Sequence, residues 1–334
     1  MRAVLTLVVL GALLQAGTPV AARAVPLTPV HVRFFPLLFE APVFIAIEEG
    51  YFAAQGIEVR FEEIRDTSLV WPAMMAGQLD VQVGQTNAGL FEAMRRGVKL
   101  RIVADASHAT PEDNSVTFMV RQDLIDSGRF RALKDLRGMR ITLASRGGIG
   151  EWILQQILSN RALLTERDVQ IQQVPPPLVA DAFRAKTIDA ATTAEPFVTR
   201  LEALGIARTV VRIHEVLPRA QLAVVIYGPG FLSRNPGLGQ RFMNAYLQGA
   251  QRYAAGKTDR NIAIIQKYTR EDPALLRRMP WPPIHPDGHI NTESILQFQS
   301  WLVRQGYLES VVGSDRFLDA SFARRANQSL KKAP

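Results

Sequence analysis

The segment from Ser145 to Gly150 is the clearest candidate for binding chemistry in this 334-residue chain. It reads Ser-Arg-Gly-Gly-Ile-Gly, follows a predicted strand and opens a predicted helix. Helix N-termini expose unpaired N–H groups and the positive end of the helix dipole, which favour an anion. Gly147 and Gly148 would let a ligand approach the backbone, and Arg146 could add a bidentate hydrogen bond. The alternative is a plain glycine-rich turn in which Ser145 caps the helix.

Other polar or aromatic residues follow predicted strands elsewhere in the chain. We expect the full set of ligand contacts to be Phe39, Glu40, Gln85, Thr86, Asn87, Ser107, Ser145, Arg146, Gly147, Gly148, Thr193 and Glu195. Each has a structural alternative, because Thr86 or Asn87 can cap the next helix and Glu195 can be a first-turn carboxylate. Arg146 would suit an anion, whereas Glu40 and Glu195 would suit an amine or a heteroaromatic ring.

Several chemistries lack the residues that they need. The chain has no cysteine, which removes thiol catalysis and thiolate metal sites. Its five histidines include one pair four residues apart, His285 and His289, but form no His-Glu-x-x-His pattern, so we expect no metal site. His108 is the only histidine placed near the expected ligand contacts, where a solvated loop histidine is the alternative. No Gly-x-Ser-x-Gly motif provides a hydrolase nucleophile. We therefore expect no catalytic residue and no cofactor.

The formal net charge of +8 is spread along the chain. Nucleic-acid binding usually requires clustered basic residues with aromatic platforms, and the sequence has no such cluster. We expect no nucleic-acid partner.

The first 24 residues have the features of a signal peptide. Arg2 is a short positive region, Ala3 to Leu14 is apolar but too short to span a bilayer, and Ala22-Arg23-Ala24 provides small residues for cleavage. We expect cleavage after Ala24 and export to the periplasm. The alternative is an uncleaved membrane anchor.

Residues 69–88 and 178–197 repeat one pattern of a short helix, an aspartate, a short apolar strand and a polar cluster. Without gaps, the alignment pairs Leu69 with Leu178, Val70 with Val179, Ala73 with Ala182, Ala76 with Ala185, Leu79 with Ile188 and Asp80 with Asp189. In open α/β sheets, ligands collect at the carboxyl ends of the strands. The repeat therefore predicts two lobes, each with a polar strand end.

The apolar periodicity predicts an alternation of strands and helices, typical of sheets with parallel strands. Predicted strands are 30–35, 57–61, 99–104, 116–120, 139–143, 169–174, 208–213 and 222–227, and predicted helices include 42–53, 88–96 and 150–160. After residue 230 the pattern turns helical, at 237–255, 259–268, 273–279 and 292–306. The apolar strands 116–120 and 222–227 are the expected crossings between the lobes.

Five motifs in order resemble the solute-binding proteins of nitrate, sulfonate and taurine ABC importers. They are Gly50-Tyr51-Phe52-Ala53-Ala54-Gln55-Gly56-Ile57-Glu58-Val59, Ala76-Gly77-Gln78-Leu79-Asp80-Val81, Asp135-Leu136-Arg137-Gly138-Met139-Arg140-Ile141, Ile188-Asp189-Ala190 with Glu195-Pro196-Phe197, and Pro286-Asp287-Gly288-His289-Ile290-Asn291. The same superfamily includes binding proteins for thiamine pyrimidine precursors.

The resemblance implies an α/β, two-lobed periplasmic-binding-protein fold of the second class. Two open, mostly parallel sheets flanked by helices would enclose a cleft. We expect residues 25–117 and 224–322 to form lobe 1, 118–223 to form lobe 2, and 323–334 to be a frayed basic tail.

The resemblance also implies no catalysis. A monomer would close around a small molecule (a sulfonate, nitrate-like anion, carboxylate or pyrimidine-type compound) and deliver it to an inner-membrane ABC permease and its ATPase. The alternatives are a pyrimidine-forming thiamine-biosynthetic enzyme of the same fold and a ligand-sensing domain. Such enzymes carry a cysteine-rich segment, which this chain lacks.

Overall fold

The computed structural model describes residues 26–332 except 65, 113–114 and 235. The predicted signal peptide, residues 1–24, and its cleavage site lie outside the described residues. No helix among the described residues combines the length and apolar character needed to cross a membrane.

The first sheet has five strands in the order β2-β1-β3-β10-β4. Their bounds are Thr28–Arg33 (β1), Ile57–Glu62 (β2), Val81–Gly84 (β3), Arg101–His108 (β4) and Gln221–Tyr227 (β10). Strand β1 runs parallel to β2 and β3, whereas β10 is antiparallel to β3 and β4. All seven residues of β10 are buried, as its unbroken apolar run predicts.

The second sheet repeats this arrangement in the order β7-β6-β8-β5-β9. Its strands are Val116–Arg121 (β5), Arg140–Leu143 (β6), Gln170–Gln173 (β7), Ala190–Ala194 (β8) and Ala207–Arg212 (β9). Here β5 is the antiparallel strand, paired with β8 and β9. The predicted α/β fold with two open sheets is confirmed, with both sheets mixed.

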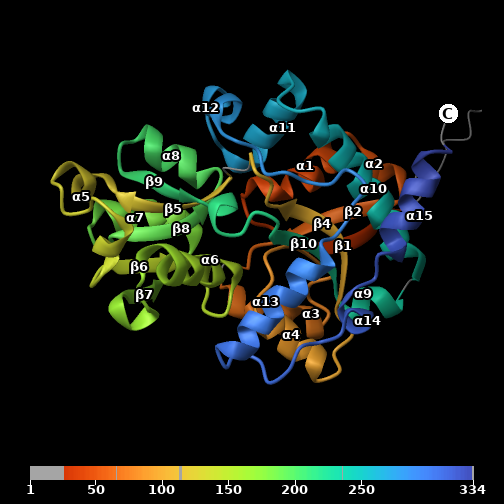
Figure 1. Cartoon of the computed structure of the whole chain (residues 1–334). Helices are drawn as coiled ribbons and strands as arrows, with labels where there is room; N and C mark the ends of the chain where they lie inside the picture. Colours follow the sequence, from red (N-terminus) through yellow and green to blue (C-terminus); the bar gives the residue numbers. More distant parts are fainter. Residues whose placement is uncertain (1–25, 65, 113–114, 235, 333–334) are drawn as a thin grey trace, which may run out of the picture.

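Helices flank both sheets (Figure 1). Around the first sheet lie α1 (Ala41–Glu48), α2 (Tyr51–Ala54), α3 (Val70–Met75), α4 (Ala88–Arg95), α9 (Pro229–Arg234), α10 (Pro236–Ala254), α11 (Asp259–Thr269), α12 (Pro273–Arg278), α13 (Thr292–Arg304), α14 (Ser314–Phe317) and α15 (Ser321–Leu330). Around the second lie α5 (Gln122–Asp126), α6 (Ile149–Ile157), α7 (Val179–Arg184) and α8 (Phe197–Ala203). The four helices predicted beyond residue 230 correspond to α10, α11, α12 and α13.

Two predicted elements differ from the structure. The helix expected over 42–53 is divided in two, because Gly50 adopts a left-handed conformation with φ of 75°. The tail expected to fray from 323 instead belongs to α15 up to Leu330, and Phe322, Ala323 and Ala326 on this helix are buried. These three residues supply an apolar face at helical spacing, which packs with residues of α10 in one core.

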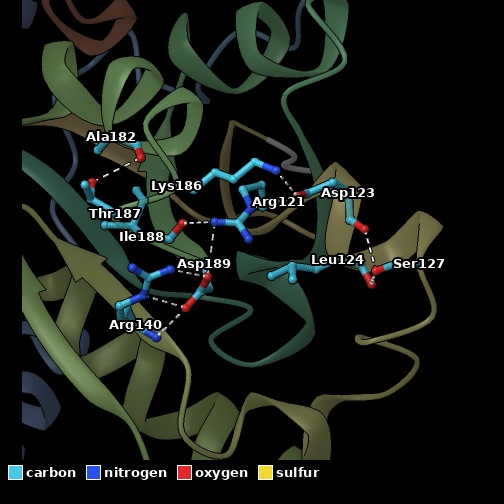
Figure 2. Close-up of polar contacts among 10 residues, drawn as sticks. All are labelled: Arg121, Asp123, Leu124, Ser127, Arg140, Ala182, Lys186, Thr187, Ile188 and Asp189. Carbon is cyan, nitrogen blue, oxygen red and sulfur yellow. Dashed lines mark hydrogen bonds and ion pairs between the residues drawn. The ribbon is translucent and has the colours of Figure 1, made fainter.

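The repeated aspartates have the same structural role in the two sheets. Asp80 accepts a hydrogen bond from the backbone N–H of His31 on β1 at 3.0 Å. Asp189 accepts the equivalent bond from Arg140 on β6, also at 3.0 Å. Figure 2 shows Asp189 between Arg140 and Arg121, whose guanidinium groups reach its carboxylate at 2.8 and 3.2 Å. The repeat in the sequence therefore corresponds to the same contact in both sheets, in which an aspartate carboxylate accepts a backbone N–H of the neighbouring strand.

Two connections join the segments that build the two sheets. The chain passes from β4 to β5 through residues 109–115 and returns from β9 to β10 through residues 213–220. The lobe boundaries predicted from the sequence stay a prediction; the strands of the second sheet all lie between residues 116 and 212.

Candidate functional site

A pocket lies where the carboxyl ends of strands from both sheets meet. Its volume is about 80 Å³. The wall from the first sheet side includes Arg33, Phe35, Phe39, Glu40, Trp71, Gln82, Gln85, Thr86 and Asn87, and the opposite wall includes Val116, Ala144, Ser145, Gly150, Pro176, Thr192, Thr193 and Ala194. A molecule in this pocket would contact both sides at once.

Seven of the residues predicted to contact a ligand line this pocket: Phe39, Glu40, Gln85, Thr86, Asn87, Ser145 and Thr193. Ser107 and Glu195 instead line a second cavity of about 10 Å³, which shares Phe39 and Gln85 with the first. Arg146, Gly147 and Gly148 line neither cavity.

A carboxylate of the protein itself bonds the loop just before helix α6. Glu151 is fully buried, and its Oε2 accepts a hydrogen bond from the Gly147 N–H at 2.6 Å. Arg146 pairs with Glu151 at 2.7 Å and with Glu166 at 3.1 Å. Burial raises the pKa of Glu151, while the Gly147 N–H and Arg146 oppose that rise. The Gly147 N–H and the Arg146 guanidinium of the Ser145–Gly150 motif are therefore engaged within the chain, whereas Ser145 and Gly150 line the pocket.

The Ser145–Gly150 loop also contacts the far side of the pocket. Gly147 O accepts a hydrogen bond from the Ala88 N–H at 2.8 Å, and Gly148 forms a backbone bridge with Asn87. The Tyr307 hydroxyl donates to Glu151 at 3.2 Å. These residues therefore join the two sides of the molecule beside the pocket.

Asn87 has the capping role that was its structural alternative. Its Oδ1 accepts from the Leu90 N–H at 3.2 Å and so caps α4. The same oxygen accepts from the indole N–H of Trp71 at 2.7 Å, which holds that ring in the pocket wall. The Asn87 side-chain oxygen therefore accepts two hydrogen bonds within the protein and positions the Trp71 ring in the pocket wall.

Among the pocket residues that were not predicted from the sequence are the polar residues Arg33, Thr67, Gln82 and Thr192. Arg33 is the last residue of β1, so its place at a strand end could have identified it. Gln82 is a buried polar residue between two valines of β3. Gly84 leaves it space, since a Cβ at that glycine would lie 2.4 Å from the Gln82 amide nitrogen.

Burial perturbs two carboxylic acids next to the pocket. Burial raises the pKa of Glu40 well above its usual range, although the Phe35 N–H and the Arg33 guanidinium oppose the rise. Burial also raises the pKa of Glu195 to about 8, against hydrogen bonds from the Thr199 hydroxyl and N–H. Both side chains thus lie where a charge is costly unless a partner stabilises it.

A larger groove of about 630 Å³ lies outside the pocket and shares Phe35 with it. Its walls include Phe34, Phe61 and Tyr268 on one side and Pro175, Pro177 and Leu178 on the other. We place the binding site in the smaller pocket, because that is where buried polar side chains converge. The groove would give a longer molecule a way out past Phe35.

Two histidines far apart in the sequence lie together beside β4. Metal-ligating atoms of Asp105, His108 and His285 lie within 4.8 Å of one another. However, the Asp105 carboxylate already accepts from His108 Nδ1 at 2.9 Å, from the His285 N–H at 2.7 Å and from Gln221 Nε2 at 2.6 Å. The two imidazole rings stack at 3.8 Å. We therefore assign this cluster a role in holding the chain together.

The sequence matches one family model over residues 23–267, described as the NMT1-like family. The chain belongs to the NMT1-like family. The resemblance to ABC solute-binding proteins drawn from its motifs is confirmed by relatives of this NMT1-like chain. One is the riboflavin-binding protein RibY of Chloroflexus aurantiacus, 24% identical over 70% of this chain and 66% of the relative. Another is the nitrate/nitrite binding protein NrtA of a Nostoc species, 21% identical over 69% of this chain and 55% of the relative. The matched region thus spans less than two thirds of these relatives.

Solved structures share the fold of this NMT1-like chain at low identity. The periplasmic nitrate-binding protein NrtA of Synechocystis has a TM-score of 0.77 at 13% identity, covering 92% of this chain and 90% of that one. The alkanesulfonate-binding protein SsuA of Xanthomonas axonopodis has a TM-score of 0.67 at 17% identity, covering 90% and 99%. The desulfurization enzyme DSZB also shares the fold, with a TM-score of 0.64 at 16% identity, covering 90% and 99%.

Proposed function

We propose that this chain is the exported solute-binding component of an ABC importer. It captures a small molecule in the pocket between the two sheets and delivers it to an inner-membrane permease and its ATPase. The observation that carries this proposal is the origin of the pocket walls, which come from strand ends of both sheets. A ligand that touches both sides favours the closed form by its extra contacts there.

The relatives support binding and transport. RibY and the two NrtA proteins are named as binding proteins, and the Synechocystis NrtA is named as periplasmic. Their printed ligands differ: riboflavin for RibY, nitrate and nitrite for the Nostoc NrtA, and alkanesulfonate for SsuA. Relatives of this kind therefore support the class of protein and leave the ligand to be argued from the pocket.

An enzymatic role would need a reacting group in the pocket. The desulfurization enzyme DSZB shows that this fold also occurs in enzymes. The chain has no cysteine and therefore no thiol nucleophile, and the pocket side chains described above are binding groups. We therefore favour binding without chemical change.

The test is to incubate the purified protein with a compound that it binds and to recover that compound by mass spectrometry. An unchanged compound, together with a more compact particle by small-angle scattering when ligand is present, is the expected result. A stoichiometric or catalytic conversion of the bound compound would overturn the proposal in favour of an enzyme.

A further inference from the structure

Among the described residues, five buried polar atoms without a hydrogen-bond partner in the chain lie at one place: Arg33 Nη2, Glu40 Oε1, Gln82 Oε1, Thr192 Oγ1 and Thr193 Oγ1. Other such atoms, on Arg241, Arg252 and Asn261, do not line the pocket. All five residues line the pocket between the sheets. Buried polar groups are almost always satisfied in folded proteins, since leaving one without a partner is destabilising. These five atoms therefore indicate which hydrogen-bonding groups a ligand of this pocket carries.

Arg33 requires an acceptor. Its Nε donates to Ile64 O at 3.0 Å, and its guanidinium carbon lies 4.8 Å from the centre of the Phe35 ring. These contacts hold the group in place with Nη2 unpaired. The ligand must therefore present an oxygen or a ring nitrogen with a lone pair to Arg33. The two threonine hydroxyls can donate to the same acceptor group.

Gln82 Oε1 requires a donor, and Glu40 Oε1 can accept one. A glutamine Oε1 only accepts hydrogen bonds, so its partner must carry an N–H or an O–H. Glu40 holds Phe35 N–H with Oε2 at 3.0 Å and leaves Oε1 without a partner. An inorganic anion or an alkylsulfonate offers only acceptors. It would satisfy Arg33 and the threonines but would leave Gln82 Oε1 unpaired.

We propose, on the basis of the solute-binding role above, that the ligand presents a carboxamide-type edge to this pocket. In a lactam, imide or urea group, a carbonyl acceptor and an N–H donor stand side by side. The carbonyl faces Arg33 and the threonines, and the N–H faces Gln82 and Glu40. The aromatic residues Phe35, Phe39 and Trp71 in the walls suit a flat ring carrying that edge.

The first experiment compares two sets of probes on the full mature protein by thermal unfolding. The acceptor-only set is nitrate and ethanesulfonate, and the amide set is uracil, nicotinamide and riboflavin. The matched controls are 1,3-dimethyluracil and N,N-dimethylnicotinamide, which keep the carbonyl oxygen and lose the N–H. We expect a saturable rise in Tm with at least one amide probe and a smaller rise or none with its methylated control.

The outcomes separate the ligand class from the solute-binding role. Stabilisation by nitrate or ethanesulfonate and by no amide probe would overturn the ligand class and leave the solute-binding role in place. Equal affinity for an amide probe and its methylated control would also overturn the ligand class. No stabilisation by any probe would count against both proposals.

The second experiment uses variants at the pocket. We expect Gln82→Leu and Thr193→Val each to weaken binding of the amide probe, which calorimetry would measure as a dissociation constant about ten times higher. The matched controls are Gln170→Leu and Thr187→Val, at exposed positions outside the pocket, which should bind as the wild type does. If a pocket variant shows the wild-type circular dichroism spectrum and binds the amide probe unchanged, the assignment of that residue is overturned.

Discussion

The pKa of Glu195, raised to about 8, predicts how stability changes with pH. In the unfolded chain this carboxyl ionises near its ordinary value of 4.5, whereas in the folded protein it stays protonated to a much higher pH. The folded state is therefore disfavoured progressively as the pH rises from about 4.5 to about 8. The full shift corresponds to at most about 5 kcal/mol.

Glu195→Gln removes that titration. We expect the variant to keep a flatter profile of unfolding free energy between pH 4.5 and pH 8 than the wild type, and to be the more stable of the two at pH 8. Urea denaturation at several pH values measures this. Parallel profiles for the two proteins would show that Glu195 does not ionise abnormally in the folded state.

For single residues, the sequence indicates which polar side chains lie near strand ends. It gives little indication of which of them are already paired within the protein and which can contact a ligand. Arg146 and Glu40 are both charged residues near predicted strand ends, yet Arg146 is paired with Glu151 and Glu166 while Glu40 faces the pocket. Glu151 comes from a helix turn and Glu166 from a separate loop. Only their positions in space decide that Arg146 is engaged.

The start of helix α6 leads to a prediction about an element. Arg146→Ala leaves the buried Glu151 carboxylate with only the Gly147 N–H and Tyr307 as partners. We expect a loss of about 1–2 kcal/mol in unfolding free energy, since Arg146 is partly exposed and solvent screens part of its charge. Ligand affinity should change little, because Arg146 does not line the pocket.

Urea denaturation and calorimetry with one bound probe together test this prediction, with Arg184→Ala as the control at an exposed ion pair. If Arg146→Ala loses affinity for the probe while its unfolding free energy is unchanged, Arg146 contacts the ligand, as the sequence predicted.

The repeated aspartates allow a paired test of the two sheets. Asp80→Ala and Asp189→Ala each remove the carboxylate that holds the backbone of the neighbouring strand. We expect each to lower the unfolding free energy by about 1.5–3 kcal/mol, the usual range for hydrogen bonds to charged groups. Asp181→Ala, at an exposed position, should cost much less. An unaffected Asp189 variant would show that its two arginines and not its carboxylate hold this strand.

The elements themselves were largely predictable. Strands such as Val116–Arg121 and Gln221–Tyr227 are apolar runs bounded by polar residues, so their positions follow from composition alone. The prediction of a frayed tail from residue 323 was wrong. The apolar face of α15 is short and lies among basic residues, so the sequence pattern did not indicate a packed helix. The pairing of the strands was harder to predict from the sequence, because some pairs join residues more than 100 positions apart, as in β4 with β10.

At the scale of the whole molecule, Gln221 lies where the chain returns to the first sheet. Its amide nitrogen donates to Asp105, to Ser107 O and to Ala223 O, and its Oε1 accepts from the Asn291 N–H. We expect Gln221→Ala to lower the unfolding free energy by about 2–3 kcal/mol, because the buried Asp105 loses a charged hydrogen bond.

The control for this variant is Gln297→Ala, whose side chain bonds only Glu293 at the surface. Equal stability of both variants in urea denaturation would show that the contacts of Gln221 are replaceable.

The place of β10 in the first sheet has a consequence for the order in which the chain acquires structure. This strand lies between β3 and β4, although it is the last strand in the sequence. As the chain is synthesised, β4 therefore emerges before the strand that joins it to β3. The second sheet needs only residues 116–212 and is complete earlier. The first sheet cannot be complete until residue 227 has emerged, so we expect the edges of β3 and β4 that pair with β10 to stay open after the second sheet has formed.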